Sequence, residues 1–360
     1  MKKILVALSG GVDSAAAAAV LQEQGYTVEG ATMDLLSGLG PREGCGSSQA
    51  VADAKKVAEH LGIRHHVFDF SRIFRTAVVE PFMKEYVSGR TPNPCVMCNH
   101  AIKFGAFLDR ALDMGFDAIA TGHYGEIVQD PTGIYRLKMA PVKGKDQSYV
   151  LYRLNQHMLS HLILPIGCME KAQVRQKASQ VGLDVANKKD SQEICFIPDG
   201  DYAAFLMREG CESQPGWFVN RTGERLGKHK GLIHYTVGQR KGLGVALGRP
   251  QYVLALNTAC NEVVLGDNEE TFVQEMICRE TVYLSGQAPQ QPFDAQVKIR
   301  YSALPAAAHV VPMGEGKVYV RFCEPQRAVT PGQSAVFYDG EFVLGGGIIE
   351  TGIFPDSQNK

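Results

Sequence analysis

A glycine- and serine-rich loop near the N-terminus is the first place in this 360-residue chain where residue types and spacing suggest chemistry. It reads Ser9-Gly10-Gly11-Val12-Asp13-Ser14 and lies between an apolar run typical of a strand and an alanine-rich stretch typical of a helix. Glycines let backbone N–H groups approach an anion, and the helix N-terminus adds partial positive charge. The two serine hydroxyls are donors for phosphate oxygens, while Asp13 is suited to hold Mg²⁺ or to cap the helix. The loop therefore predicts a phosphate site.

Two better-known phosphate motifs do not match this loop. No Gly-Lys-Ser/Thr follows it, so it is not a Walker A loop, and its glycine spacing is not that of a dinucleotide fingerprint. The structural alternative is a glycine turn followed by an Asp or Ser helix cap.

Two cysteine motifs are the second candidate. Residues 89–99 read GRTPNPCVMCN, and residues 190–197 read DSQEICFI. Prolines fix φ and interrupt helices, so we predict that Cys95 and Cys98 lie on a rigid loop. Three chemistries compete: half of a zinc site, a redox pair, and two thiols that pass sulfur as a persulfide. A zinc ribbon needs a second Cys-X-X-Cys pair, which is missing, and a thioredoxin-like pair begins a helix, which the preceding Asn-Pro disfavours.

The remaining cysteines carry no motif. We predict that they are ordinary buried side chains: Cys45, Cys168, Cys211, Cys260, Cys278 and Cys323. The total of nine is odd, and no export signal precedes the chain, so a disulfide framework is not expected. No apolar run is long enough to span a membrane, and the expected location is the cytoplasm.

The elements that must position these motifs alternate between strand-like and helix-like stretches up to about residue 200. Such alternation, with glycines at the helix ends, predicts an α/β domain with a parallel sheet whose ligands bind at the carboxyl ends of the strands. Beyond residue 270 short alternating strands predict an all-β barrel or sandwich. We therefore expect a catalytic domain at 1–200, a small basic central domain at 201–268 and a β domain at 269–360.

The net charge of −1 excludes a globally basic nucleic-acid binder, although one segment is locally basic. Residues 217–250 contain seven Lys or Arg against one acid, Glu224. This pattern suits contacts with nucleic-acid phosphates, and a solvated charged linker is the alternative. Trp217 and Tyr235 are candidates for base stacking or for the core.

Seven motifs in order resemble a known family. The loop SGGVDS by itself resembles the pyrophosphate-binding loop of the N-type ATP pyrophosphatases. With it come GRTPNPCVMCN, ATGHY at 120–124, GKDQSYVLY at 144–152, DSQEICFI, YTVGQRKGLG at 235–244 and TPGQSAVFY at 330–338. The whole set is similar to bacterial tRNA-specific 2-thiouridylases.

This resemblance implies a fold and a reaction. It implies an adenine nucleotide alpha-hydrolase-like domain with a parallel sheet, a small central domain and a C-terminal β-barrel. It implies that ATP, with Mg²⁺, adenylates the C2 oxygen of wobble uridine 34 in Lys, Glu and Gln tRNAs, and that sulfur from a donor or relay protein then replaces it. The products would be 2-thiouridine, AMP and pyrophosphate, with no membrane involved.

The resemblance also assigns roles to residues. Cys98 matches the nucleophile and Cys195 the persulfide carrier, while Asp13 belongs to the catalytic set. The matches to ATP contacts are Ala7, Leu8, Ser9, Gly10, Gly11, Val12, Asp13, Ser14, Met33 and Gly122. The matches to tRNA contacts are Asn93, Pro94 and Cys95 at the target base, and His123, Lys145, Asp146, Gln147, Arg300, Tyr301 and Gln333 elsewhere.

One position departs from the family's best-known form. Cys95 stands where an Asp often precedes the nucleophile by three residues. Cys95, Cys98 and Cys195 are then three thiols able to ligate a [4Fe–4S] cluster with one open iron, so this route stands beside the persulfide route. Two other functions are alternatives to a 2-thiouridylase: an ATP-dependent ligase that amidates a small metabolite, and a non-catalytic RNA-binding protein. Neither explains the paired thiol motifs.

Overall fold

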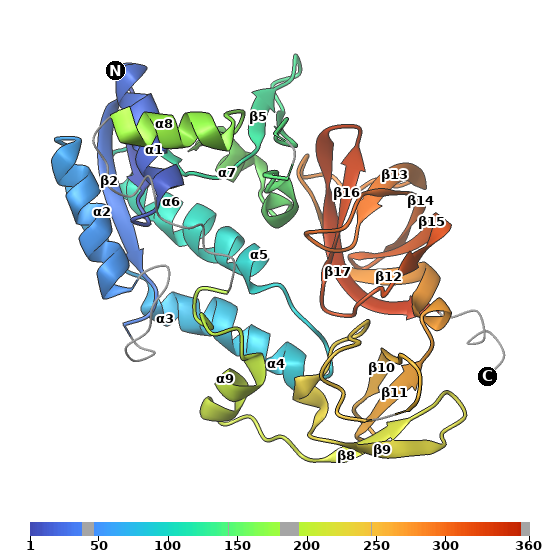
Figure 1. Ribbon diagram of the computed structural model, residues 1–360. Helices are drawn as coiled ribbons and strands as arrows, with labels where there is room; N and C mark the ends of the chain where they lie inside the picture. The colour runs from blue at the N-terminus through green and yellow to red at the C-terminus, as the bar shows by residue number, and fades with distance from the viewer. Residues whose placement is uncertain (38–46, 143, 181–193, 246, 354–360) are drawn as a thin grey trace.

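The fold was obtained as a computed structural model, which describes residues 1–37, 47–142, 144–180, 194–245 and 247–353. Figure 1 shows three parts in chain order: an α/β part in blue to green, a small β part in yellow, and a β-barrel in orange to red. The N-terminus lies at the α/β part, and the described residues end in the barrel (Figure 1).

A five-stranded parallel sheet is the centre of the N-terminal part. Its order is β3-β2-β1-β4-β7, which confirms the predicted parallel α/β architecture. The strands are β1 (Lys3–Ala7), β2 (Thr27–Asp34), β3 (His65–Asp69), β4 (Ala118–Ala120) and β7 (Leu162–Ile163). The helical segments are α1 (Val12–Glu23), α2 (Ser48–His60), α3 (Ser71–Phe74), η1 (Arg75–Val79), α4 (Glu80–Val87), α5 (Pro94–Cys98), η2 (Asn99–Ala106), α6 (Phe107–Asp113), η3 (Ser148–Leu151), α7 (Gln156–Ser160) and α8 (Lys171–Gln180).

Successive side chains of each strand point to opposite faces of this sheet, and helices cover both faces. On β1, Ile4 and Val6 pack with the apolar sides of α1, α2 and α8, while Leu5 and Ala7 pack with the segment from α3 to α6. A sheet covered on both faces needs continuous apolar strands, which is what residues 4–8 show. The carboxyl ends of β1, β2 and β4 consequently meet between the two helical layers.

A hairpin from the N-terminal part joins the barrel. Strands β5 (Glu126–Gln129) and β6 (Tyr135–Lys138) pair with each other, and Lys138 pairs with Phe342 of β17 (Phe342–Ile353). The guanidinium of Arg136 also lies 3.9 Å from the centre of the Phe342 ring. The hairpin therefore extends the barrel sheet with residues far away in sequence.

The C-terminal strands close into a barrel, as predicted. They are β12 (Phe272–Tyr283), β13 (Phe293–Lys298), β14 (Ala306–Gly314), β15 (Lys317–Arg327), β16 (Ser334–Asp339) and β17. Neighbours run in the order β12-β15-β14-β13-β16-β17, and β12 also pairs with β17. This last pairing removes the open edges that a sandwich would keep.

The central part is a small β unit with its own core. It consists of β8 (Gly216–Val219), β9 (Arg225–His229), η5 (Leu232–His234), β10 (Tyr252–Asn257), β11 (Glu262–Gly266) and η6 (Glu269–Thr271). The preceding helix α9 (Tyr202–Arg208) packs into the core of the N-terminal part. The four strands of the β unit have the order β10-β11-β8-β9. Phe218 and Tyr235 pack edge-on, with ring centres 5.2 Å apart, in the centre of this unit. Tyr235 is therefore a core residue rather than a base-stacking one.

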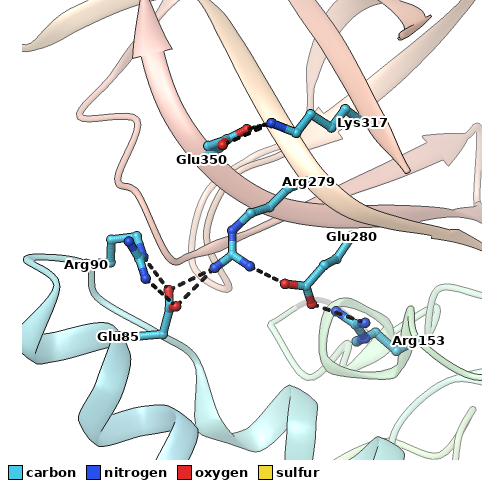
Figure 2. A network of polar contacts seen from close by, with 7 residues as sticks. All are labelled: Glu85, Arg90, Arg153, Arg279, Glu280, Lys317 and Glu350. Atoms are coloured by element: carbon cyan, nitrogen blue, oxygen red, sulfur yellow. Dashed lines mark hydrogen bonds and ion pairs between the residues drawn. The ribbon is translucent and has the colours of Figure 1, made fainter. Parts of the chain in front are cut away.

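An ionic network joins the N-terminal part to the barrel. Figure 2 shows Glu85 of α4 between Arg90 and Arg279, the latter from β12. The Arg90 Nη2 atom lies 2.7 Å and the Arg279 Nη2 atom 3.0 Å from the Glu85 Oε1 atom. Arg279 also pairs with Glu280, whose other oxygen lies 3.8 Å from the Arg153 Nη2 atom. The Glu85 carboxylate thus pairs with two arginines, Arg90 from the N-terminal part and Arg279 from the barrel.

Replacing Glu85 by Gln should lower stability at neutral pH and not in acid. Burial by itself would raise the pKa of Glu85, but hydrogen bonds and charges from Arg90 and Arg279 outweigh it and lower the pKa below its ordinary 4.5. A lowered folded-state pKa stabilises the fold above the unfolded-state pKa, and this stabilisation disappears as the pH falls through the folded value. We expect the thermal midpoint to fall by about 2–4 °C at pH 7.

The pH dependence decides whether the charge matters. The difference between the parent protein and Glu85→Gln should vanish well below pH 4.5, and an unchanged difference there would show that shape alone matters. Glu59→Gln is the matched control, because Glu59 lies on the surface of α2 and pairs only loosely, at 3.9 Å, with Lys55. Its midpoint should stay within error at both pH values.

No helix among the described residues is long and apolar enough to cross a bilayer.

Candidate active site

The phosphate loop connects β1 to α1 at the carboxyl end of the sheet. Gly10 has φ of +72°, and a Cβ atom there would lie 2.8 Å from the Ala50 carbonyl oxygen, so only glycine fits. The Ser14 hydroxyl accepts from the Ser9 N–H at 3.2 Å and donates to the Gly11 carbonyl at 3.0 Å. Gly11 is the N-cap of α1, and its cap makes no side-chain hydrogen bond. The Asp or Ser cap offered as the alternative is therefore absent here.

A cavity of about 170 Å³ opens beside this loop. It lies at the ends of β1, β2 and β4, where the parallel sheet was expected to bind a ligand. Its lining residues are Ala7, Leu8, Ser9, Asp13, Ser14, Thr32, Met33, Lys103, Thr121, Gly122, His123 and Gln147. The structure thus gathers most of the residues matched to ATP, together with His123 and Gln147, which were matched to tRNA. Gly10, Gly11 and Val12 are absent from this wall and contribute backbone to the loop beneath it.

Asp13 is held by two residues that the sequence analysis missed. The Lys171 Nζ atom of α8 lies 2.8 Å and 3.0 Å from the two Asp13 oxygens. The Tyr124 hydroxyl donates to Asp13 Oδ1 at 3.0 Å. Tyr124 belongs to the ATGHY motif, which was a usable signal, whereas nothing near Lys171 in the sequence marks it.

Lys103 and His123 face each other in the cavity wall. Burial and then the Lys103 charge hold the pKa of His123 well below its usual range, so this imidazole is neutral at physiological pH. Its Nδ1 atom lies 2.8 Å from the Thr121 hydroxyl. Lys103 is the lysine that lines the described cavity, and it was also missed, although it follows the first cysteine motif closely. The wall therefore combines a cation with a neutral imidazole.

Gly122 allows the loop after β4 to touch the start of α1. A Cβ atom at Gly122 would lie 2.7 Å from the Asp13 carbonyl carbon and 2.8 Å from the Ser14 nitrogen. We expect Gly122→Ala to push these elements apart and weaken ATP binding about tenfold or more, measured by calorimetric titration with ATP. Gly125→Ala is the control, because its Cβ would meet neighbours only at ordinary contact distances of 3.5 Å or more. Equal ATP affinity in both variants would contradict this packing argument.

The first cysteine motif is helical, so the predicted rigid loop is wrong. Cys95 and Cys98 lie on α5, which continues through η2 into α6. Asn93 is the N-cap, and its side chain accepts from the Cys95 N–H at 3.1 Å. Pro94 occupies the first helical position, where its missing N–H would have no partner anyway. The Asn-Pro dipeptide starts this helix, so it is no argument against a redox pair.

The two thiols with assigned roles belong to one apolar cluster. Cys98 is 7% exposed, and Cys195 is half-buried at the edge of the same cluster. Phe196, next to Cys195, lies edge-on to Phe74 and Phe82 with ring centres 5.6 Å and 5.3 Å apart. These rings sit on α3 and α4, directly before the helix that carries Cys98. Phe196, which follows Cys195, thus packs against helical segments that precede the thiol helix in the chain.

The prediction for the remaining cysteines is largely wrong. Cys278 is buried in the barrel, and burial strongly raises the pKa of its thiol. Cys211 is half-buried, whereas Cys168, Cys260 and Cys323 are exposed. The sequence around a lone cysteine does not show whether its side chain points into the core or toward solvent. Cys45 lies outside the described residues.

Barrel residues hold the segment that precedes the thiol helix. The Gln333 side chain donates to the Thr91 carbonyl at 2.7 Å, and the Thr91 N–H donates to the Pro331 carbonyl at 2.8 Å. Gly332 packs so closely that a Cβ atom would lie 2.8 Å from the Thr91 nitrogen. Gln333 was matched to tRNA, and in the structure it also positions the strip Asn93–Cys95.

The other residues matched to tRNA collect where η3 meets the barrel. Asp146 accepts from the Ala140 and Ser148 N–H groups at 3.0 Å and 3.1 Å and so shapes the loop with Lys145. The Arg300 Nη2 atom donates to the Ala328 carbonyl. Tyr301 is 43% exposed. Its ring lies edge-on to that of Tyr149 in η3, with ring centres 6.1 Å apart. Burial, followed by the charges of Asp146 and Cys95, raises the pKa of Tyr301.

The basic segment 217–250 is folded into the central part. Arg225 and Lys228 lie over the Trp217 ring at 4.5 Å and 5.3 Å from its centre, so cations cover this indole. A hollow of about 250 Å³ is lined by Arg240, Arg249 and the glycine-rich turn between them. The segment is therefore structured rather than a solvated linker.

The sequence suggested two metal groups, a [4Fe–4S] cluster and Mg²⁺, and the described side chains differ in how well they suit each of them. Over the described residues, no three His, Cys, Asp or Glu side chains form a group suited to a metal ion. Cys95, Cys98 and Cys195 are all described, so this structure does not assemble the three thiols that a [4Fe–4S] cluster needs. Mg²⁺ needs only one or two carboxylates besides substrate phosphates, and Asp13 in the cavity wall fits that requirement.

Comparison with known proteins decides the family. Family models match residues 2–199 as a tRNA methyl transferase HUP domain, 203–267 as a tRNA methyl transferase PRC-barrel domain and 273–349 as an aminomethyltransferase beta-barrel domain. The tRNA-specific 2-thiouridylase MnmA of Acetivibrio thermocellus is 50% identical over 97% of this chain and 99% of that protein. The chain belongs to the tRNA-specific 2-thiouridylase family.

A second 2-thiouridylase, from Clostridioides difficile, is 47% identical over 97% of this chain and 98% of its own length. A solved 4-thiouridine synthetase–RNA complex with bound ATP is 17% identical, with a TM-score of 0.37 over 58% of this chain and 50% of that one, which is too low to carry an argument. The family assignment therefore rests on full-length identity to the 2-thiouridylases.

Proposed function

We propose that this protein adenylates the C2 oxygen of uridine 34 in Lys, Glu and Gln tRNAs and replaces that oxygen by sulfur. One observation carries the proposal beyond family membership. A continuous helical segment, α5–η2–α6, bears Cys95 and Cys98 at its start and Lys103 in the wall of the phosphate-loop cavity. This shared helical segment supports a site in which sulfur chemistry and nucleotide chemistry adjoin.

Adenylation is the first step that the cavity supports. The uracil C2 oxygen attacks the α-phosphorus of ATP, the bond from that phosphorus to the bridging oxygen breaks, and pyrophosphate leaves. The N–H groups of the phosphate loop and the Lys103 ammonium group face the charge that develops on the phosphates. Mg²⁺, when bound at Asp13, neutralises phosphate charge. Asp13 also holds Lys171, which keeps a second cation beside the loop.

Sulfur transfer is the second step, and the thiols perform it. A donor or relay protein loads Cys195 as a persulfide. The Cys98 thiolate attacks the inner sulfur of this persulfide, which forms a Cys98–Cys195 disulfide and releases hydrosulfide. Hydrosulfide attacks C2 of the adenylated base, the C2–O bond breaks, and AMP leaves. A thiol reductant then supplies two electrons that restore both cysteines.

The expected partners and location are part of this proposal. The reaction needs tRNA and a sulfur donor, and both are cytoplasmic partners. The basic segment 217–250 and the hollow between Arg240 and Arg249 supply positive charge for tRNA phosphates. The wobble base must leave its stack to reach the thiol helix.

The test follows labelled ATP with and without tRNA. AMP formation that requires an unmodified tRNA bearing uridine 34, together with 2-thiouridine in the recovered tRNA, supports the proposal. Pyrophosphate release without tRNA would instead indicate a small-metabolite ligase, and the absence of any release an RNA-binding protein. Iron and acid-labile sulfide assays after anaerobic purification test the sulfur route, because the persulfide route predicts full activity without iron.

A further inference from the structure

Lys298 is a buried lysine that the proposed mechanism does not use. It ends β13 and is 8% exposed. Its ammonium group lies 5.8 Å from the centre of the Tyr149 ring and 5.6 Å from that of Tyr301. Tyr149 comes from η3 and Tyr301 from the barrel, so the amine lies at the junction of the two parts. Burial lowers the pKa of Lys298, which reflects the cost of keeping a charge in this place.

This amine has no partner of opposite charge close by. Among the residues that the structure describes, no carboxylate lies within ion-pair distance of the Lys298 Nζ atom, and no hydrogen bond from it is found. Asp146 acts on it only at longer range, because its oxygens are already engaged by the Ala140 and Ser148 donors. The two cation–π contacts stabilise the ammonium group but leave its charge without a carboxylate partner among the described residues.

The surroundings indicate which anion would bind. The two rings beside Lys298, Tyr149 and Tyr301, lie edge-on to each other, and Tyr149 belongs to η3, which packs against the thiol helix α5. The neighbouring cation Arg300 already donates to the carbonyl oxygens of Ala328 and Arg327. Lys298 is thus the cation of this junction that is left for a ligand arriving at the thiol helix. A lysine ammonium group is a compact point charge suited to a phosphate oxygen.

We propose that Lys298 binds a backbone phosphate of the tRNA next to the target nucleotide, and so holds the strand while the base enters the site. This inference rests on the proposed function, since it takes tRNA as the ligand. It assigns Lys298 a binding role and leaves the chemical steps to the cavity and the thiols.

The experiment measures tRNA affinity at several salt concentrations. Each phosphate contact to a single strand contributes about 0.7 to the slope of log K against log salt. Lys298→Met keeps the length and removes the charge, so we expect the slope to fall by about 0.7 between about 50 and 200 mM salt, with about tenfold weaker binding at the lower concentration. Lys298→Arg keeps the charge and should keep the parent slope.

Control variants separate this contact from a loss of structure. Lys55→Met removes a lysine whose side chain is 68% exposed on α2 and should leave slope and affinity unchanged. ATP affinity without tRNA should be equal in all variants, and a loss of it in Lys298→Met would assign the residue to folding. Weaker binding with an unchanged slope would assign Lys298 to a base carbonyl and overturn the proposal. Failure of the parent protein to bind tRNA would instead overturn the proposed function.

Discussion

Replacing either Cys98 or Cys195 by Ser should abolish tRNA thiolation, by about a thousandfold or more, while pyrophosphate release in a single turnover persists. The reason is that serine cannot carry a persulfide or form the disulfide that releases sulfur. In the proposed mechanism, adenylation uses the cavity beside the phosphate loop, whose lining does not include either cysteine. Quantifying 2-thiouridine in the digested tRNA, alongside the pyrophosphate released from labelled ATP, separates the two half-reactions.

The disulfide gives this prediction a direct readout. Without reductant, the parent protein should stop after one turnover with Cys98 bonded to Cys195, and mass spectrometry of peptides should show this bond in neither variant. Cys260→Ser is the matched control, because Cys260 is an exposed cysteine of the central part. The affinity for tRNA should stay within about twofold in every variant. If binding were lost with thiolation, the two cysteines would be structural residues.

Replacing Asp13 by Ala should block the preceding step. We expect tRNA-dependent AMP formation to fall by about a hundredfold or more, because the carboxylate that holds Lys171 and faces the ATP phosphates is gone. Persulfide loading of Cys195 should remain, since it needs no nucleotide. The measurement is AMP release from labelled ATP, combined with persulfide labelling of the protein.

A second variant separates the two tasks of Asp13. If the carboxylate acts mainly at the phosphates and their Mg²⁺, Lys171→Met should lose less than tenfold. Equal losses in Asp13→Ala, Lys171→Met and the double variant would show that the ion pair acts as one unit. Asp109→Ala, an exposed change on α6, should retain full activity. Unchanged AMP release in Asp13→Ala would remove Asp13 from the catalytic set.

The local chemistry of the phosphate loop could be predicted from the sequence because it depends on neighbours in the chain. Glycines between a strand and a helix can form only a few backbone shapes, and the apolar runs that flank them identify a buried parallel sheet. Met33 and Gly122 were assigned to the same site by family resemblance, and they line the cavity as implied. Asn93 and Pro94 show the limit of such reasoning. A proline in the interior of a helix interrupts it, whereas a proline at the first position of a helix is compatible with helix formation.

Residues that act across distance could not be predicted in this way. Lys171 reaches Asp13 from α8, and Lys103 reaches the cavity from the helix of the thiols. Each is one lysine among many in the sequence. Whether its charge faces solvent or a ligand depends on helix rotation and packing, which no local motif encodes.

By itself, then, the sequence determined the phosphate-loop and cysteine motifs and the order of sheet, basic segment and barrel, because those follow from residue type and periodicity. The roles of the cysteines were implied by family resemblance alone. Only the tertiary structure decided how the parts meet. It paired a hairpin of the N-terminal part with the barrel, joined the two through Glu85, and left the Lys298 ammonium group between two tyrosine rings. Contacts of that kind depend on distances between residues more than a hundred positions apart, and such distances are settled by packing of the whole chain.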